Sequence, residues 1–122
     1  MKYCLVVDDS RVIRRVATKI VQDLGFDVEE AENGRKALNA CAIRMPDVLL
    51  IDTDMPDLGG IDTVGALRQM PGGKKAVVVF CATENEPAYI RQALEAGGNE
   101  YIMKPFDSEI VRSKFLLLDL LG

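Results

Sequence analysis

Near its start the chain reads Tyr3-Cys4-Leu5-Val6-Val7-Asp8-Asp9, five apolar residues followed directly by two carboxylates. A short continuous apolar run of this kind is typical of a strand that is buried on both faces of a parallel sheet. The same pattern returns at Val48-Leu49-Leu50-Ile51, which is followed by Asp52-Thr53-Asp54. Further strands are expected at residues 26–31, 76–81 and 101–103.

Segments with helical spacing of apolar residues lie between these strands. The first of them ends at Gly25, a common helix stop, and carries Val12, Ile13, Val16, Ile20 and Leu24. Four more helices are expected, opened by Asn33-Gly34, near Ile61, by Asn85-Glu86-Pro87 and by Asp107. Strand and helix thus alternate about five times, joined by short loops.

This alternation predicts an α/β fold in which helices cover both faces of a parallel sheet. Of the common doubly wound arrangements, a five-stranded sheet fits the order 2-1-3-4-5 best, which is the flavodoxin-like order. The 122 residues are enough for one domain and too few for two, so we expect a single domain over residues 1–122.

Composition excludes several classes of function. The formal net charge is −4, and the sequence shows no basic face of the kind that nucleic-acid-binding domains carry. Histidine is absent, so the commonest general base and the commonest transition-metal ligand are missing. Cys4, Cys41 and Cys81 form no CxxC pair, which favours reduced thiols in a cytoplasmic protein. No secretory apolar region and no membrane-spanning run is found in the sequence, so we expect no membrane insertion.

Ligands of doubly wound sheets bind beyond the carboxyl ends of the strands, at the point where the strand order reverses. Asp8-Asp9 follow the expected first strand, Asp52 and Asp54 follow the third, and Lys104 follows the fifth. Any one of these acids could be a polar loop cap. Their convergence at one rim of the sheet favours a site instead.

Carboxylates packed together repel one another, and a divalent cation would relieve that repulsion. Ligands that are all oxygen favour Mg²⁺, Mn²⁺ or Ca²⁺, and Mg²⁺ uses one or two carboxylates together with waters and a phosphate oxygen. Asp8, Asp9, Asp52 and Asp54 carry four negative charges, against three positive charges from Mg²⁺ and Lys104. A phosphoryl donor could approach such a site, whereas the bare acids would repel it.

Three motifs together resemble the receiver domain of two-component response regulators, most of all the single-domain chemotaxis type. They are Val6-Val7-Asp8-Asp9-Ser10, Leu50-Ile51-Asp52-Thr53-Asp54-Met55-Pro56 and Tyr101-Ile102-Met103-Lys104-Pro105-Phe106. The resemblance covers essentially the whole chain. It implies a protein that is not an enzyme, that accepts a phosphoryl group from a histidine kinase, and that signals by changed protein–protein binding in chemotaxis or motility.

The resemblance also implies a role for each residue of the site. Asp52 would be the phospho-acceptor, and Asp9 would bind Mg²⁺ directly. Asp8 would hold a metal-bound water, and the backbone carbonyl of Asp54 would complete the metal shell. Lys104 would pair with the phosphoryl group and, with the metal, stabilise its charge during transfer.

The switch that the family implies is incomplete in this sequence. In the family a hydroxyl after the fourth strand bonds the phosphoryl group, and an aromatic on the fifth strand, matched here by Tyr101, turns inward. The hydroxyl position falls on Ala82, and Thr83 is one residue later, where an extended chain turns its side chain to the other face. Either Thr83 reaches the site through a distorted loop, or the hydroxyl relay is missing.

The sequence is also compatible with two other functional classes, a phosphatase and a flavodoxin. Asp52-Thr53-Asp54 also fits the DxD motif of haloacid-dehalogenase-type phosphatases, with Asp52 as nucleophile and Asp54 as general acid. A flavodoxin is the other interpretation, although Asp8-Asp9 would repel the phosphate of a flavin. Acetyl phosphate separates the three classes, because receivers label stoichiometrically, phosphatases turn over, and flavodoxins are yellow.

No effector domain follows the last expected helix, so we expect the signal to leave through a protein surface. The target could be a flagellar motor switch or another kinase. The last helix carries more apolar residues than one buried stripe needs: Ile110, Val111, Phe115, Leu116, Leu117, Leu118, Leu120 and Leu121. We expect some of them to face outward and to form a homodimer or target contact; the alternative is that the terminal leucines fold back onto the core.

Overall fold

Five parallel strands form one sheet in the order β2-β1-β3-β4-β5, in a computed structural model that describes residues 2–83 and 87–121. The strands are β1 (Tyr3–Val7), β2 (Asp27–Ala31), β3 (Val48–Asp52), β4 (Val77–Ala82) and β5 (Glu100–Met103). This is the predicted order, so the doubly wound, flavodoxin-like α/β fold is confirmed.

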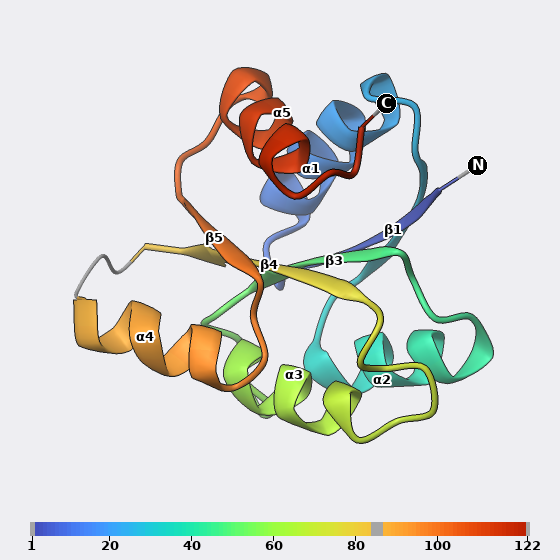
Figure 1. Ribbon diagram of the computed structural model, residues 1–122, viewed down its shortest axis with the longest axis vertical. Coiled ribbons are helices and arrows are strands. Elements are labelled where there is room, and N and C mark those ends of the chain that lie inside the picture. The colour runs from blue at the N-terminus through green and yellow to red at the C-terminus, as the bar shows by residue number, and fades with distance from the viewer. Residues whose placement is uncertain (1, 84–86, 122) are drawn as a thin grey trace.

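The five helices lie on both faces of the sheet, with α1 and α5 on one face and α2, α3 and α4 on the other (Figure 1). Their bounds are α1 (Arg11–Asp23), α2 (Gly34–Ile43), α3 (Gly60–Arg68), α4 (Pro87–Glu95) and α5 (Ser108–Leu117). Asn85 and Glu86, expected to open α4, lie outside the described residues. None of the helices in the described ranges is both long enough and apolar enough to cross a membrane.

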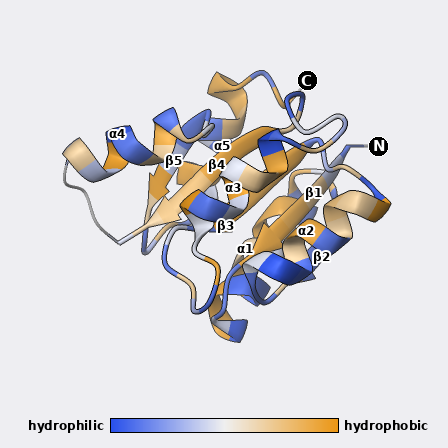
Figure 2. Ribbon diagram, turned by 90° about the horizontal axis from the view of Figure 1, so that it is seen from below, coloured by the Kyte–Doolittle hydropathy of each residue, from blue (hydrophilic) through white to orange (hydrophobic). Residues whose placement is uncertain are grey.

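Side chains on the two faces of the central strands belong to two separate apolar clusters, because successive strand residues point to opposite sides of the sheet. Leu5, Leu49 and Phe80 pack beneath α2, α3 and α4. Leu50 and Phe115 belong to the other cluster, which packs beneath α1 and α5. The three central strands, β1, β3 and β4, are therefore hydrophobic along almost their whole length. The helices instead carry both hydrophobic and hydrophilic residues (Figure 2).

Side-chain caps fix where three of the helices begin. Ser10 accepts a hydrogen bond from the Ile13 N–H at 3.3 Å, and so caps α1 directly after the Asp8-Asp9 pair. Asn33 and Asp107 cap α2 and α5 in the same way. The loops after β1, β2 and β5 are thus short and anchored at their ends.

The C-terminal segment combines both outcomes expected for its apolar residues. Ile110, Leu116 and Leu117 are exposed, so part of α5 does face outward. Beyond α5 the backbone turns at Asp119 (φ 61°), and the Leu120 N–H donates to the Phe115 carbonyl oxygen at 2.9 Å. Leu120 is consequently buried, as the alternative of terminal leucines folding back predicts.

Gly60, the first residue of α3, packs against the backbone of the third strand. Its N–H donates to the Thr53 carbonyl oxygen at 3.0 Å, and a Cβ at this position would overlap the Asp52 carbonyl oxygen. We therefore expect Gly60→Ala to lower the free energy of unfolding by about 1–3 kcal/mol, because backbone atoms cannot yield cheaply. Urea unfolding measures this change.

Gly65→Ala is the matched control, because it lies in the same helix and a Cβ there would have no atom within 4 Å. It should raise stability by about 0.5–1 kcal/mol, since alanine is the better helix former. Equal effects at the two positions would show that the packing of α3 on β3 is not close.

Candidate functional site

Residues from three separate strand ends meet at one rim of the sheet. The Lys104 Nζ lies 2.7 Å from Asp8 Oδ2 and 3.1 Å from Asp52 Oδ1. Carboxylate oxygens of Asp8, Asp9 and Asp52 lie within 4.8 Å of one another. The convergence predicted from the strand order is therefore present in the structure.

Backbone hydrogen bonds hold the two buried acids in place. Asp8 is 3 % exposed and Asp52 is 6 % exposed, whereas Asp9 is exposed to solvent. Asp8 Oδ1 accepts from the Ser10 N–H at 2.9 Å, and Asp52 Oδ1 accepts from the Asp54 N–H at 3.3 Å. These contacts come from residues two positions further along the chain, so the loops themselves orient the carboxylates.

Burial and charge act against each other at this cluster. Burial raises the pKa of Asp52, the negative charge of Asp8 raises it further, and contact with Lys104 only partly offsets the rise. For Lys104, burial alone would lower the pKa, but hydrogen bonds to Asp8 and Asp52 and their charges outweigh it and raise the pKa. Lys104 is thus a cation at neutral pH, and among the described residues it alone bridges Asp8 and Asp52.

This donor set suits a hard divalent cation. Three carboxylates lie together, and two of them, Asp8 and Asp52, contact the one ammonium of Lys104, so the cluster has an excess of negative charge. Its ligand atoms are all oxygens, and the exposed Asp9 leaves an open side for metal-bound waters. Mg²⁺ prefers oxygen ligands of this kind and retains several waters. The residues therefore fit Mg²⁺.

The side chain of Asp54 lies outside the cluster of three acids and has its own partner. The hydroxyl of Tyr89, in the first turn of α4, donates to Asp54 Oδ1 at 3.2 Å. Burial raises the pKa of Tyr89, interaction with the Thr53 side chain lowers it in part, and the nearby Asp54 and Asp52 raise it again. Sequence reasoning missed Tyr89, which belongs to none of the three motifs.

The two candidate positions for the family hydroxyl differ in exposure. Ala82 ends β4 and is buried, and its carbonyl oxygen accepts from the Lys104 N–H at 2.8 Å. This bond extends the strand one residue beyond the predicted end. Thr83 comes next and is exposed. Whether Thr83 substitutes for the absent hydroxyl stays a prediction.

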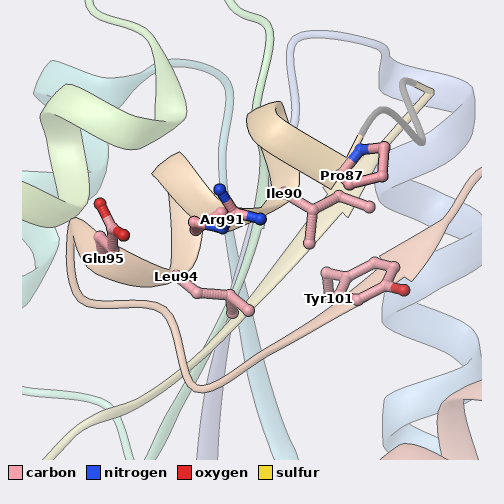
Figure 3. A pocket seen from close by; sticks show the side chains of 6 residues that line it. All are labelled: Pro87, Ile90, Arg91, Leu94, Glu95 and Tyr101. Carbon is pink, nitrogen blue, oxygen red and sulfur yellow. The ribbon is translucent and has the colours of Figure 1, made fainter.

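The expected switch residue, Tyr101, is half-buried on β5 and faces a groove beside α4 (Figure 3). The groove has a volume of ≈ 570 Å³. Its lining residues are Pro87, Ile90, Arg91, Leu94, Glu95 and Tyr101. Ile90 and Leu94 project from α4 towards the Tyr101 ring, so the groove is apolar in its middle (Figure 3).

The raised pKa of Asp52 has a consequence for stability. An acid whose pKa is raised in the folded state costs stability once it is ionised, from about pH 4 upward, where the unfolded chain loses its proton first. We expect Asp52→Asn to raise the free energy of unfolding of metal-free protein at pH 7. The gain should shrink as the pH falls towards 4, and urea unfolding in a chelating buffer measures it.

Asp57→Asn is the matched control, because Asp57 is an exposed acid of the following loop and asparagine tolerates its positive φ of 68°. Its effect should stay within about 0.5 kcal/mol. A loss of stability in Asp52→Asn at pH 7 would mean that the ion pair with Lys104 outweighs the cost of burying Asp52.

Comparison with known proteins gives the same family as the three motifs. Residues 4–115 match the family described as response regulator receiver domain. The chain is 38% identical to chemotaxis protein CheY1 of Helicobacter pylori over 112 residues, 90% of each chain. It is 32% identical to chemotaxis protein CheY of Thermotoga maritima over 106 residues, 86% of this chain and 87% of that protein.

A solved structure agrees with these relatives. The chemotaxis response regulator CheY4 of Vibrio cholerae superposes with a TM-score of 0.91 at 31% identity, covering 99% of both chains. The resemblance that the sequence motifs indicated is thereby confirmed. The chain belongs to the family of response regulator receiver domains.

Proposed function

We propose that this receiver domain acts in a two-component phosphorelay, and that Asp52 accepts a phosphoryl group from a histidine kinase. The observation that supports this most is the contact of one lysine, Lys104, with both Asp8 and Asp52 beside the exposed Asp9. A buried carboxylate next to an ammonium and a divalent-cation site has what a phosphoryl acceptor needs.

In the proposed reaction, a carboxylate oxygen of Asp52 attacks the phosphorus of a phosphohistidine. An O–P bond forms, the N–P bond breaks, and the neutral imidazole leaves after taking up a proton. Asp9 and Asp52, with the Asp54 carbonyl, would hold Mg²⁺, and Asp8 would orient one of its waters. The bound metal would neutralise charge on the transferring group.

Lys104 would contribute by changing its partner during transfer. It contacts Asp52 Oδ1 in the structure, and a phosphoryl group added there would place oxygens within reach of the same ammonium. The chain would catalyse only its own phosphorylation and dephosphorylation, so it is not proposed as an enzyme with a separate substrate. The phosphatase alternative would use Asp54 as general acid, and it predicts turnover of acetyl phosphate instead of stoichiometric labelling.

The output would be a changed affinity for a second protein. Two apolar features are available for such a contact: the groove between α4 and β5, which Tyr101 lines, and the exposed Ile110, Leu116 and Leu117 of α5. We propose a role in chemotaxis or motility in the cytoplasm, because the relatives are named chemotaxis proteins. The proposed target is a flagellar motor switch or another kinase. A homodimer through α5 is the alternative use of this surface.

Asp52→Asn should abolish labelling by radiolabelled acetyl phosphate in the presence of Mg²⁺. The amide is a far weaker nucleophile than the carboxylate, and it carries no charge to pair with Lys104. Asp57→Asn should label like the wild type, because that acid lies outside the cluster. Undiminished labelling of Asp52→Asn would refute the assignment of the acceptor.

Leu117→Lys should remove an association that phosphorylation changes, because Leu117 is 69% exposed on the outer side of α5. Sedimentation velocity with and without acetyl phosphate and Mg²⁺ tests for the homodimer, and pull-down from a lysate tests for a target. Ile43→Lys is the matched control, since Ile43 is 88% exposed on α2 at the other face of the sheet. If the wild type is a monomer in both states and Leu117→Lys retains every target, α5 carries no contact.

A further inference from the structure

The first turn of α4 is tied to the mouth of the acidic site through one hydroxyl. Tyr89 donates to Asp54 Oδ1 at 3.2 Å, and Asp54 lies two residues beyond Asp52. The Asp54 N–H in turn donates to Asp52 Oδ1 at 3.3 Å. Two hydrogen bonds therefore link the proposed acceptor to α4.

Other hydroxyls near the site are less suited to sense a phosphoryl group. Ala82 is buried and has only a methyl group, which can neither donate nor accept. Thr53 Oγ1 is buried and donates to the Cys81 carbonyl oxygen at 3.4 Å, while Thr83 is exposed beyond β4. Among the described residues, Tyr89 is the hydroxyl that bonds a carboxylate of this mouth.

We propose that Tyr89 takes the place of the hydroxyl missing at Ala82, by exchanging its bond to Asp54 for a bond to the phosphoryl group on Asp52. The inference rests on the proposed function, since it needs Asp52 to be phosphorylated. It makes Tyr89 a positioning residue that reports the state of Asp52 to α4.

Charge favours this exchange. Phosphorylation replaces a single carboxylate charge by a group of about −1.5 to −2 with three acceptor oxygens. Hydrogen bonds to such a group are shorter and stronger than ordinary ones. The present acceptor, Asp54, is exposed, so water competes for its bond and screens its charge. The hydroxyl thus has a better partner after phosphorylation than before it.

The exchange would change the groove that Tyr101 lines. Tyr89 precedes Ile90, which projects into that groove from the same helical turn, and Pro87 lines its upper end (Figure 3). A pull on Tyr89 towards Asp52 therefore turns or shifts the first turn of α4 against Tyr101. The signal reaches the output surface through the helix, and it needs no hydroxyl on β4.

Fluorine NMR of protein labelled with 3-fluorotyrosine tests the inference, because the chain has three tyrosines, at positions 3, 89 and 101, and no tryptophan. The resonances of wild type and variants are compared with Mg²⁺ alone and with Mg²⁺ plus saturating beryllofluoride, a phosphoryl mimic. In the wild type the Tyr89 and Tyr101 resonances should both shift. In Tyr89→Phe the shift of Tyr101 should be lost, although beryllofluoride is bound.

Two controls make the result specific. Tyr3→Phe removes a hydroxyl at the start of β1, at the opposite end of the sheet, and should keep the full response of Tyr101. Thr83→Ala should keep it too, whereas loss of the response in that variant alone would assign the relay to Thr83 and overturn the inference.

A Tyr101 shift of wild-type size in Tyr89→Phe would overturn the inference and leave the proposed function standing. Failure of the wild type itself to bind beryllofluoride with Mg²⁺ would refute the proposed function, and the role of Tyr89 with it. The bound mimic has its own fluorine resonance, so the same spectrum distinguishes the two outcomes.

Discussion

One ammonium shared between two buried carboxylates holds this site together. Lys104 lies beyond β5, yet it contacts Asp52 at the end of β3 and Asp8 after β1. Because β4 separates β5 from β3, the lysine must span the end of that strand, where the residue is the small Ala82. Lys104 closes the rim of the sheet. Its positive charge partly offsets the free-energy cost of burying the two negatively charged carboxylates.

The free-energy cost of burying ionised Asp52 makes the cluster sensitive to a change of charge at that residue. Burial and the charge of Asp8 raise the pKa of Asp52 even with Lys104 present, so the ionised acceptor is held less favourably than it would be in water. A bound divalent cation or a proton would reduce the excess negative charge. Lys104 would stabilise ionised Asp52 more if it did not also pair with Asp8. Phosphoryl transfer changes the charge at this same point, and the surrounding contacts must adjust.

The supporting scaffold lies close behind the acids. Gly60 brings α3 against the Asp52 backbone, and Ser10 caps α1 while its N–H holds Asp8. Arg14 donates to the Asp8 carbonyl oxygen at 2.8 Å and pairs with Glu30 at 3.1 Å. Asp52 thus ends a strand that α3 packs against, and Asp8 lies in a loop that the start of α1 fixes within a few residues.

Much of this arrangement could be predicted from the sequence, because topology determines it. β1 is expected at residues 3–7 and is observed there, because a short continuous apolar run between polar residues is typical of a buried strand. The strand order alone brings Asp8, Asp52 and Lys104 to one rim of the sheet, and their contacts then depend on the reach of Lys104 across the end of β4. Boundaries were less certain: β4 runs to Ala82 because of a hydrogen bond from the distant Lys104 N–H.

Features that depend on the placement of helices were not predictable. The contact of Tyr89 with Asp54 depends on how α4 lies against the sheet, and no short motif encodes that orientation. The burial of Leu120 depends on a left-handed residue, Asp119, which sequence patterns do not reveal. Helical spacing indicated an excess of apolar residues in this segment, but it could not say which of them fold back.

A crystal structure of the protein with Mg²⁺ and beryllofluoride would test the central claim most directly. We predict Mg²⁺ bound by Asp9 and Asp52, the mimic on Asp52, and the Lys104 ammonium moved from its shared position to contact a fluorine of the mimic. A structure in which Lys104 still bridges Asp8 and Asp52, with the metal or the mimic bound elsewhere, would contradict it.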